Sequence, residues 1–144
     1  MPTTLFTTRS ELETAAVGRD LARRLSAGST VLLVGDLGAG KTAFVRGLAD
    51  GLGIPPDEVS SPTFTIMQEY RGGRLPLFHV DLYRLNDPRE AEDLGLDEIA
   101  VDGVLAIEWA DRLPRTPPDA IRITIEHARD TERRVTLEGS YSDL

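Results

Sequence analysis

The sequence has 144 residues, of which 40% are hydrophobic and 28% are charged. These values are typical of one globular domain over residues 1–144, and the apolar runs are too short to cross a membrane. A net charge of −8 disfavours direct binding to a nucleic-acid backbone. The absence of cysteine excludes disulfides, thiolate nucleophiles and cysteine-based zinc sites. We therefore expect a cytoplasmic protein that has no secretory signal.

The N-terminal region predicts a strand and then a helix. Residues 5–8 form a short β-prone run, and Ser10 with Glu13 is a capping-box signature. An amphipathic helix is predicted from there to about Ser26. Its expected core face contains Leu12, Ala16, Leu21 and Leu25.

A strand, a glycine-rich loop and a second helix follow. Residues 30–34 are apolar and β-branched, which is typical of a buried strand. The helix is predicted from about Lys41 to Asp50, with Gly51 capping its end. This order of strand, loop and helix is the context in which phosphate-binding loops occur.

The second half of the chain predicts two antiparallel hairpins. One spans residues 63–80 around a tight turn at 71–74, and the other spans residues 121–137. An acidic helix at 89–94, preceded by proline, and a buried strand at 104–107 lie between them. Because the loop–helix unit implies parallel strands, we expect an α/β fold with a mixed sheet flanked by helices.

The chain contains 15 arginines and one lysine, Lys41. The lysine belongs to a segment that fits the P-loop pattern Gly-x-x-x-x-Gly-Lys-[Ser/Thr]. Backbone N–H groups of such a loop surround the β-phosphate, while the lysine bridges the terminal phosphates and the hydroxyl of Thr42 binds Mg²⁺. The nucleotide-binding residues are therefore expected to be Gly35, Asp36, Leu37, Gly38, Ala39, Gly40, Lys41 and Thr42.

Two carboxylates follow apolar strands, Asp81 and Glu108. P-loop enzymes commonly take a magnesium ligand from the end of a strand near the loop. One carboxylate would bind the metal and the other would position the attacking water. Sequence position does not rank the two, and a simple role at the end of a strand is the alternative for each.

Three other residues leave alternatives open. Thr63 lies where a loop meets a strand, so its hydroxyl either senses the γ-phosphate or merely begins the strand. Trp109 is the one tryptophan, and core packing competes with a role beside the nucleotide or at a partner interface. His79 and His127 are too far apart in the sequence to favour a zinc site.

Four segments together resemble the TsaE (YjeE) family of small bacterial P-loop ATPases. They are the P-loop at 35–42, Ser-Pro-Thr-Phe at 61–64, His-Val-Asp-Leu-Tyr-Arg-Leu at 79–85, and Ile-Glu-Trp at 107–109. The runs at 79–85 and 107–109 are more specific than the P-loop alone. The resemblance covers about residues 5–139, and this family takes part in the threonylcarbamoyladenosine modification at position 37 of tRNA.

The resemblance implies a mixed sheet with helices on both faces, and binding and weak hydrolysis of ATP with Mg²⁺. It also implies two partners, TsaD, which transfers the threonylcarbamoyl group, and TsaB, which pairs with TsaD. The ATP cycle would reset that complex between turnovers. Contact with tRNA would then come through the partners, which suits the acidic charge.

The resemblance also implies roles for individual residues. Thr42 and Glu108 become the Mg²⁺ ligands, and Asp81 becomes the residue that acts on water or the γ-phosphate. Thr63 becomes a switch residue, so that the implied catalytic set is Lys41, Thr63, Asp81 and Glu108. Arg133 is implied to contact the nucleotide, although Arg134 beside it leaves the register open.

Two other functions remain as alternatives. One is a small-molecule P-loop kinase, against which the sequence shows no second domain and no arginine-rich lid. The other is a nucleotide-gated binding module with negligible hydrolysis. Guanine specificity is disfavoured because the Asn-Lys-x-Asp motif is absent.

Overall fold

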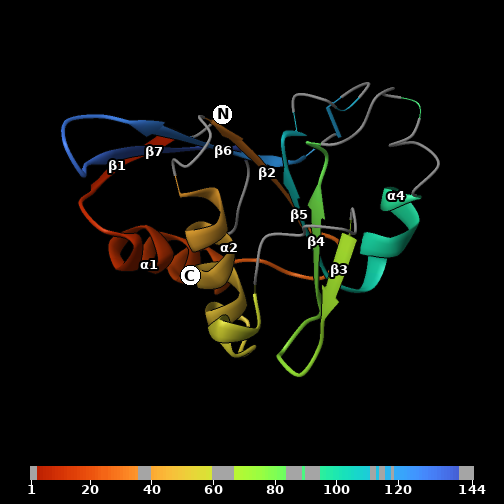
Figure 1. The fold of residues 1–144 in the computed structure, drawn as a ribbon. Coiled ribbons are helices and arrows are strands. Elements are labelled where there is room, and N and C mark those ends of the chain that lie inside the picture. Colours follow the sequence, from red (N-terminus) through yellow and green to blue (C-terminus); the bar gives the residue numbers. More distant parts are fainter. Residues whose placement is uncertain are drawn as a thin grey trace.

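The computed structural model describes residues 3–35, 40–59, 67–83, 89, 95–110, 113, 116–117 and 119–139. These residues form a seven-stranded sheet with the order β1-β7-β6-β2-β5-β4-β3 (Figure 1). The strands are β1 (Thr3–Thr8), β2 (Thr30–Gly35), β3 (Met67–Tyr70), β4 (Leu77–Asp81), β5 (Val104–Glu108), β6 (Ile121–His127) and β7 (Arg133–Glu138). The helices are α1 (Glu11–Ala22), α2 (Lys41–Gly51) and α4 (Leu96–Ile99), with 3₁₀ turns η1 (Pro56–Glu58) and η2 (Ala100–Asp102).

The sheet is parallel at its centre and antiparallel at its edges. Strand β2 pairs in parallel with β5 and β6, and β5 pairs in parallel with β4. The pairs β3–β4, β6–β7 and β1–β7 are antiparallel. The predicted mixed sheet with two hairpins is therefore confirmed. The four parallel strands, β4, β5, β2 and β6, have their carboxyl ends on the same side of the sheet.

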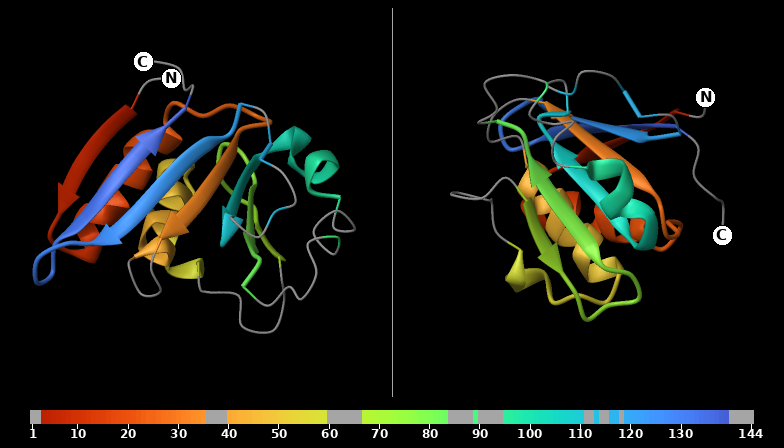
Figure 2. Two further views of the ribbon diagram at one scale, coloured as in Figure 1. Left: turned by 90° about the horizontal axis from the view of Figure 1, so that it is seen from above. Right: turned by 90° about the vertical axis from the view of Figure 1, so that its right-hand side faces the viewer.

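Helices cover both faces of this sheet. Alternating side chains of β2 point to opposite faces, so Val31 and Leu33 join one core cluster and Leu32 joins the other. The larger cluster lies against α1 and α2, while Leu96 of α4 belongs to the smaller one. Figure 2 shows α1 and α2 side by side against the sheet, with α4 apart from them beside β5. The helices expected on both faces are thus confirmed.

The backbones of α1 and α2 touch through glycine. A Cβ atom at Gly18 would lie 2.4 Å from the carbonyl oxygen of Phe44, and one at Gly47 would lie 1.9 Å from the carbonyl oxygen of Ala15. Neither distance leaves room for a methyl group. Glycine at these positions is therefore required by the close approach of the helices.

The predicted core face of α1 was partly wrong. Leu21 and Leu25 are buried as expected, but Leu12 is 84% exposed and Ala16 is only half-buried. The helix also ends at Ala22 rather than near Ser26. The buried face of α1 includes a threonine and a glycine, which a pattern of hydrophobic residues does not detect. Its buried residues are Thr14, Gly18, Leu21 and Ala22.

Two predicted helix and turn boundaries also shifted. Gly51 lies inside α2 rather than capping it, and the glycine with left-handed backbone is Gly53, with φ of 88°. The β3–β4 connection is longer than the predicted turn at 71–74, because Tyr70 pairs with Leu77. Arg74 in this connection donates to the carbonyl oxygen of Ala22, the last residue of α1 (2.8 Å), and to that of Leu25 beyond the helix (3.2 Å).

Several expected features lie outside the described residues. The start of the first hairpin at 63–66 is one of them. The acidic helix at 89–94 is another, apart from Arg89, which is helical. Among the residues that the structure describes, no helix is long and apolar enough to cross a membrane.

We predict that Gly47→Ala destabilises the protein. Helix propensity alone favours alanine over glycine by about 1 kcal/mol, so a net loss has to come from the contact with Ala15. The expected decrease in the free energy of unfolding is about 1–3 kcal/mol, measured by urea denaturation. The control is Asp50→Ala on the same helix, where loss of an exposed ion pair with Arg19 should change stability by less than about 1 kcal/mol. Equal stability of Gly47→Ala and wild type would contradict the prediction.

Candidate functional site

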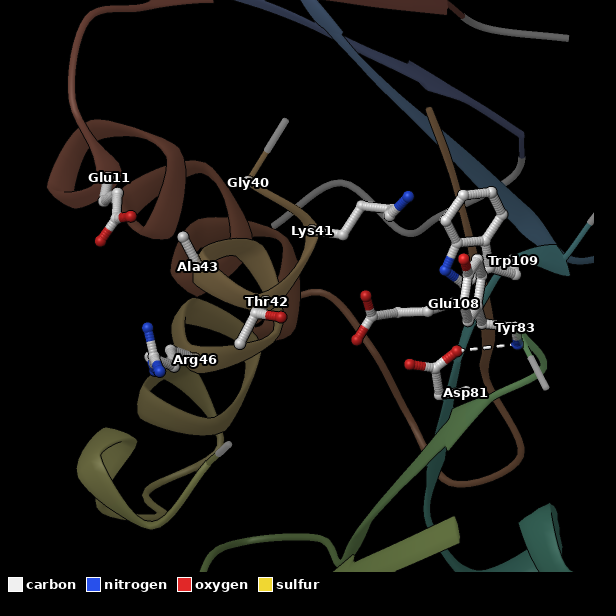
Figure 3. Close-up of a pocket in the computed structure, with 10 residues that line it drawn as sticks. All are labelled: Glu11, Gly40, Lys41, Thr42, Ala43, Arg46, Asp81, Tyr83, Glu108 and Trp109. Atoms are coloured by element: carbon white, nitrogen blue, oxygen red, sulfur yellow. Dashed lines mark hydrogen bonds between the residues drawn. The ribbon is translucent and has the colours of Figure 1, made fainter. Parts of the chain in front are cut away.

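A pocket of about 290 Å³ opens where the parallel strands end and α2 begins (Figure 3). Strand β4 contributes Asp81 to it, strand β5 contributes Glu108, and the first turn of α2 contributes Lys41 and Thr42. The sequence analysis had named these four residues separately. The full lining is Glu11, Gly40, Lys41, Thr42, Ala43, Arg46, Asp81, Tyr83, Glu108 and Trp109.

The start of α2 is suited to an anion. Gly40 precedes the helix with φ of 111° and no side-chain cap, a conformation that residues with a Cβ atom rarely adopt. The N–H groups of the first turn and the positive end of the helix dipole therefore face the pocket. Gly35 at the end of β2 is equally constrained, because a Cβ atom there would lie 1.9 Å from the carbonyl oxygen of Ile125. Asp36, Leu37, Gly38 and Ala39 lie outside the described residues, so their phosphate contacts remain a prediction.

Lys41 is 5% exposed and its ammonium group is held at the pocket wall. Its Nζ atom donates to the carbonyl oxygen of Gly35 at 2.9 Å and lies 3.9 Å from the centre of the Trp109 ring. The ring of Tyr83 lies beside that of Trp109, with centroids 5.0 Å apart. Trp109 thus lines the pocket, where its ring lies against the lysine, and it also packs against the smaller core cluster.

The two carboxylates are neighbours because of strand register. Asp81 and Glu108 are Cα partners in the parallel β4–β5 pair, so their side chains leave the sheet at the same edge and on the same face. Figure 3 shows both carboxylates and the hydroxyl of Thr42 directed into the pocket. Three oxygen-bearing side chains from three elements therefore meet at one place.

The Asp81 carboxyl has a raised pKa. Burial is the main cause, since it disfavours the ionised form, and the nearby Glu108 adds to the rise. A hydrogen bond of 2.9 Å from the Tyr83 N–H to Oδ1 opposes it, as do His79 and Lys41. The protein thus holds Asp81 where its negative charge is costly, which is common for residues that act on a ligand.

Glu108 is almost fully buried and contacts a histidine that the sequence analysis had considered only for zinc. Its exposed fraction is 4%, and its Oε2 atom lies 2.5 Å from Nε2 of His79. The sequence could have indicated that His79 lies near the carboxylates. It precedes Asp81 by two residues on a strand, so the two side chains share a face of the sheet.

Other expected residues lie apart from the pocket. Arg133 begins β7, donates to the carbonyl oxygen of Glu132 at 3.0 Å and is absent from the pocket lining, so its contact with nucleotide remains a prediction. Thr63 lies outside the described residues. The sequence analysis missed Glu11 and Arg46, which line the pocket. Arg46 lies one helical turn beyond Thr42, a spacing that could have identified it.

The pocket has the donor atoms that Mg²⁺ prefers. Within the described ranges, no group of three or more His, Cys, Asp or Glu side chains could hold a metal by itself. A hydroxyl and two carboxylates are present instead, all of them oxygen donors. Mg²⁺ is typically held by one or two carboxylates with waters and substrate phosphates, so the residues fit this ion in a nucleotide complex.

Comparisons with known proteins show the family to which the chain belongs. The model of the family "Threonylcarbamoyl adenosine biosynthesis protein TsaE" matches residues 8–135. The chain belongs to the TsaE family. A TsaE protein of Bacillus subtilis (strain 168) is 48% identical over 127 residues, which cover 87% of this chain and 78% of that protein. The TsaE protein of Treponema pallidum (strain Nichols) is 43% identical over 131 residues, covering 90% and 96%.

A solved structure is similar to the whole TsaE fold seen here. The crystal structure of YdiB from Bacillus subtilis superposes with a TM-score of 0.77 and 37% sequence identity. The match covers 96% of this chain and 86% of that one. Both relatives named above are described as tRNA threonylcarbamoyladenosine biosynthesis proteins. The resemblance read from the four sequence segments is thus confirmed at the level of the family.

We predict that Asp81→Asn makes the free protein more stable at neutral pH. Because the pKa of Asp81 is raised in the folded state, the folded protein holds this proton to a higher pH than the unfolded chain. Ionisation of Asp81 therefore does not affect the free energy of unfolding below the pKa that this group has in the unfolded chain. It lowers the free energy of unfolding as the pH rises towards the pKa in the folded state, and the loss remains above that pKa. Asparagine removes this penalty and keeps an oxygen that can accept from the Tyr83 N–H.

The measurement is urea denaturation between pH 3 and pH 8, without nucleotide or magnesium. The gain in free energy of unfolding should be present at pH 7 and should vanish near pH 3. Asp20→Asn, at an exposed position of α1, controls for the loss of an aspartate charge. A gain at pH 7 that is no larger for Asp81→Asn than for Asp20→Asn would rule out the effect of burial.

Proposed function

We propose that this protein is an ATP-binding subunit of the machinery that forms threonylcarbamoyladenosine at position 37 of tRNA, and that it hydrolyses ATP weakly. One observation carries the ATPase part: Lys41, Thr42, Asp81 and Glu108 line a single pocket at the N-terminus of α2. Family membership supports the pathway, since the similar proteins carry that name.

ATP would bind with its phosphates at the start of α2. The N–H groups of the first turn of this helix provide donors, and Lys41 reaches the same space. The P-loop residues 36–39 would complete the phosphate site. The volume of about 290 Å³ suits the phosphates and part of the nucleoside rather than a second large substrate.

The oxygen side chains would hold the metal and direct the water. We assign Thr42 and Glu108 to Mg²⁺, and we assign Asp81 to the attacking water or the γ-phosphate. Mg²⁺, when bound, would supply positive charge that stabilises the negative charge of the phosphates. The raised pKa of Asp81 makes this carboxylate a better proton acceptor than an exposed aspartate.

The partners would be TsaD and TsaB in the cytoplasm. ATP binding and hydrolysis would change a switch at Thr63 and thereby reset the TsaB–TsaD complex between turnovers. The net charge of −8 favours contact with tRNA through these partners rather than directly. The test is ATP-dependent modification of tRNA by the purified partners, with and without this protein. Equal multiple-turnover modification in both cases would refute the proposal.

Two further measurements separate this function from its alternatives. A kinase is supported if any small-molecule acceptor takes the phosphoryl group faster than water does. A nucleotide-gated binding module is supported if single-turnover ATP hydrolysis in the complex is the same for wild type and Glu108→Ala.

We predict that Lys41→Ala weakens ATP binding by about 10- to 100-fold and abolishes tRNA modification. Loss of hydrogen bonds to a charged group has a cost of about 1.5–3 kcal/mol, which corresponds to that range. Isothermal titration calorimetry measures the affinity, and circular dichroism verifies the fold. Arg23→Ala is the control, because Arg23 is an exposed basic residue just after α1 that does not line the pocket. Unchanged ATP affinity in Lys41→Ala would count against the site.

We predict that Asp81→Ala still binds ATP but hydrolyses it at least about 100-fold more slowly. Its carboxylate is assigned to the water rather than to the phosphates, so its removal affects the reaction more than binding. Single-turnover hydrolysis in the complex measures the rate, and calorimetry measures the affinity. If ATP binding itself collapsed, the assigned role of Asp81 would be wrong.

A further inference from the structure

His79 is a fully buried polar residue that the proposed reaction does not yet use. Its side chain is 0% exposed, and it lies in β4 between core residues. Nε2 lies 2.5 Å from Oε2 of Glu108, whereas Nδ1 is buried without a hydrogen-bond partner in the described part of the chain. An unpaired buried polar atom costs about 1–3 kcal/mol, so packing alone would favour an apolar residue here.

The contact with Glu108 determines which ring nitrogen carries a proton. A carboxylate oxygen only accepts hydrogen bonds, so Nε2 has to donate to Oε2. The alternative tautomer, with Nε2 unprotonated, would place two acceptors against each other and leave a buried Nδ1–H unsatisfied. His79 is therefore oriented as a donor towards one particular oxygen of Glu108.

The neighbouring carboxylate is held in the same way. Asp81 accepts from the Tyr83 N–H through Oδ1, and Glu108 accepts from His79 through Oε2. In each case an N–H group binds one carboxylate oxygen, and the described residues provide no partner for the other. Figure 3 shows the Glu108 carboxylate on the pocket side, between Thr42 and Asp81.

We propose that His79 is a positioning residue for Glu108: its Nε2–H holds Oε2 so that the second oxygen is presented to Mg²⁺ beside Thr42. This rests on the proposed function, which assigns Glu108 to the metal. Donors that hold a metal-binding side chain typically change metal affinity by 10- to 100-fold when they are removed. His79 is thus retained in the core for the orientation of Glu108 rather than for packing.

The test compares two amide substitutions that differ in reach. In His79→Gln the side-chain amide reaches the position of Nε2 and can still donate to Glu108. In His79→Asn the amide lies near the position of Nδ1 and falls short. Calorimetry measures the affinity of the full chain for a non-hydrolysable ATP analogue in Mg²⁺ and in EDTA. The ratio of the two affinities is the magnesium-dependent gain.

We expect His79→Asn to lower this gain by about 10- to 100-fold, with the affinity in EDTA within about twofold of wild type. His79→Gln should restore most of the gain. If His79→Asn does not fold, as judged by circular dichroism, His79→Leu replaces it with the same expected loss, since leucine adds no polar atom to the core.

Three outcomes would overturn the inference. They are a wild-type gain in His79→Asn, an equal loss of affinity in Mg²⁺ and in EDTA, and a folded His79→Gln that behaves like His79→Asn. Glu108→Gln is measured in parallel. If it keeps the full gain, the assignment of Glu108 to the metal fails and the inference fails with it. If it loses the gain while His79→Asn keeps it, only the role of His79 is refuted.

Discussion

The parallel register between β4 and β5 is the constraint on which the site depends. It places Asp81 directly beside Glu108 at the edge of the sheet where β2 also ends. The chain then enters α2, whose first turn carries Lys41 and Thr42. A shift of one residue in either strand would turn its carboxylate to the opposite face of the sheet, away from α2. Hydrogen bonds between the backbones of β4 and β5 therefore set the distance between the two acidic side chains.

The contact between α1 and α2 positions the helix that lines the same site. Glycines at 18 and 47 let the helix backbones touch, and the hydroxyl groups of Thr8 and Thr14 share a hydrogen bond of 2.7 Å between β1 and α1. Thr14 also lies close to Gly40, at the start of α2. Because α2 begins with the turn that we propose binds phosphate, this packing holds the proposed phosphate site in place at the end of the parallel strands. Glu11 reaches the pocket through the same arrangement.

The site brings three charged side chains, Lys41, Asp81 and Glu108, together in a partly or fully buried environment. Burial raises the pKa of Asp81, Glu108 is buried beside it, and Lys41 is buried under Trp109. Moving a charged group out of water costs free energy, and N–H groups of Tyr83 and His79 offset part of this cost for the two carboxylates. A bound dication and a polyphosphate would neutralise the remaining charges of both signs. Under the proposed function, the protein would lose some stability by burying these groups and would gain a site for a charged ligand.

The sequence alone was sufficient for the mixed sheet, both hairpins, the helix after the P-loop and the TsaE family, because each depends on local periodicity or a short motif. It also identified Lys41, Thr42, Asp81 and Glu108 as separate candidates. It misplaced Leu12 in the core and missed Glu11. The face of α1 that is buried depends on a glycine contact with α2, about 30 residues further along the chain. It did not connect His79 to Glu108 either, because these residues meet only when β4 pairs with β5. Local sequence thus determined which side chains the site has available, whereas strand register and helix packing decided which of them meet, because those contacts join segments that are distant in the chain.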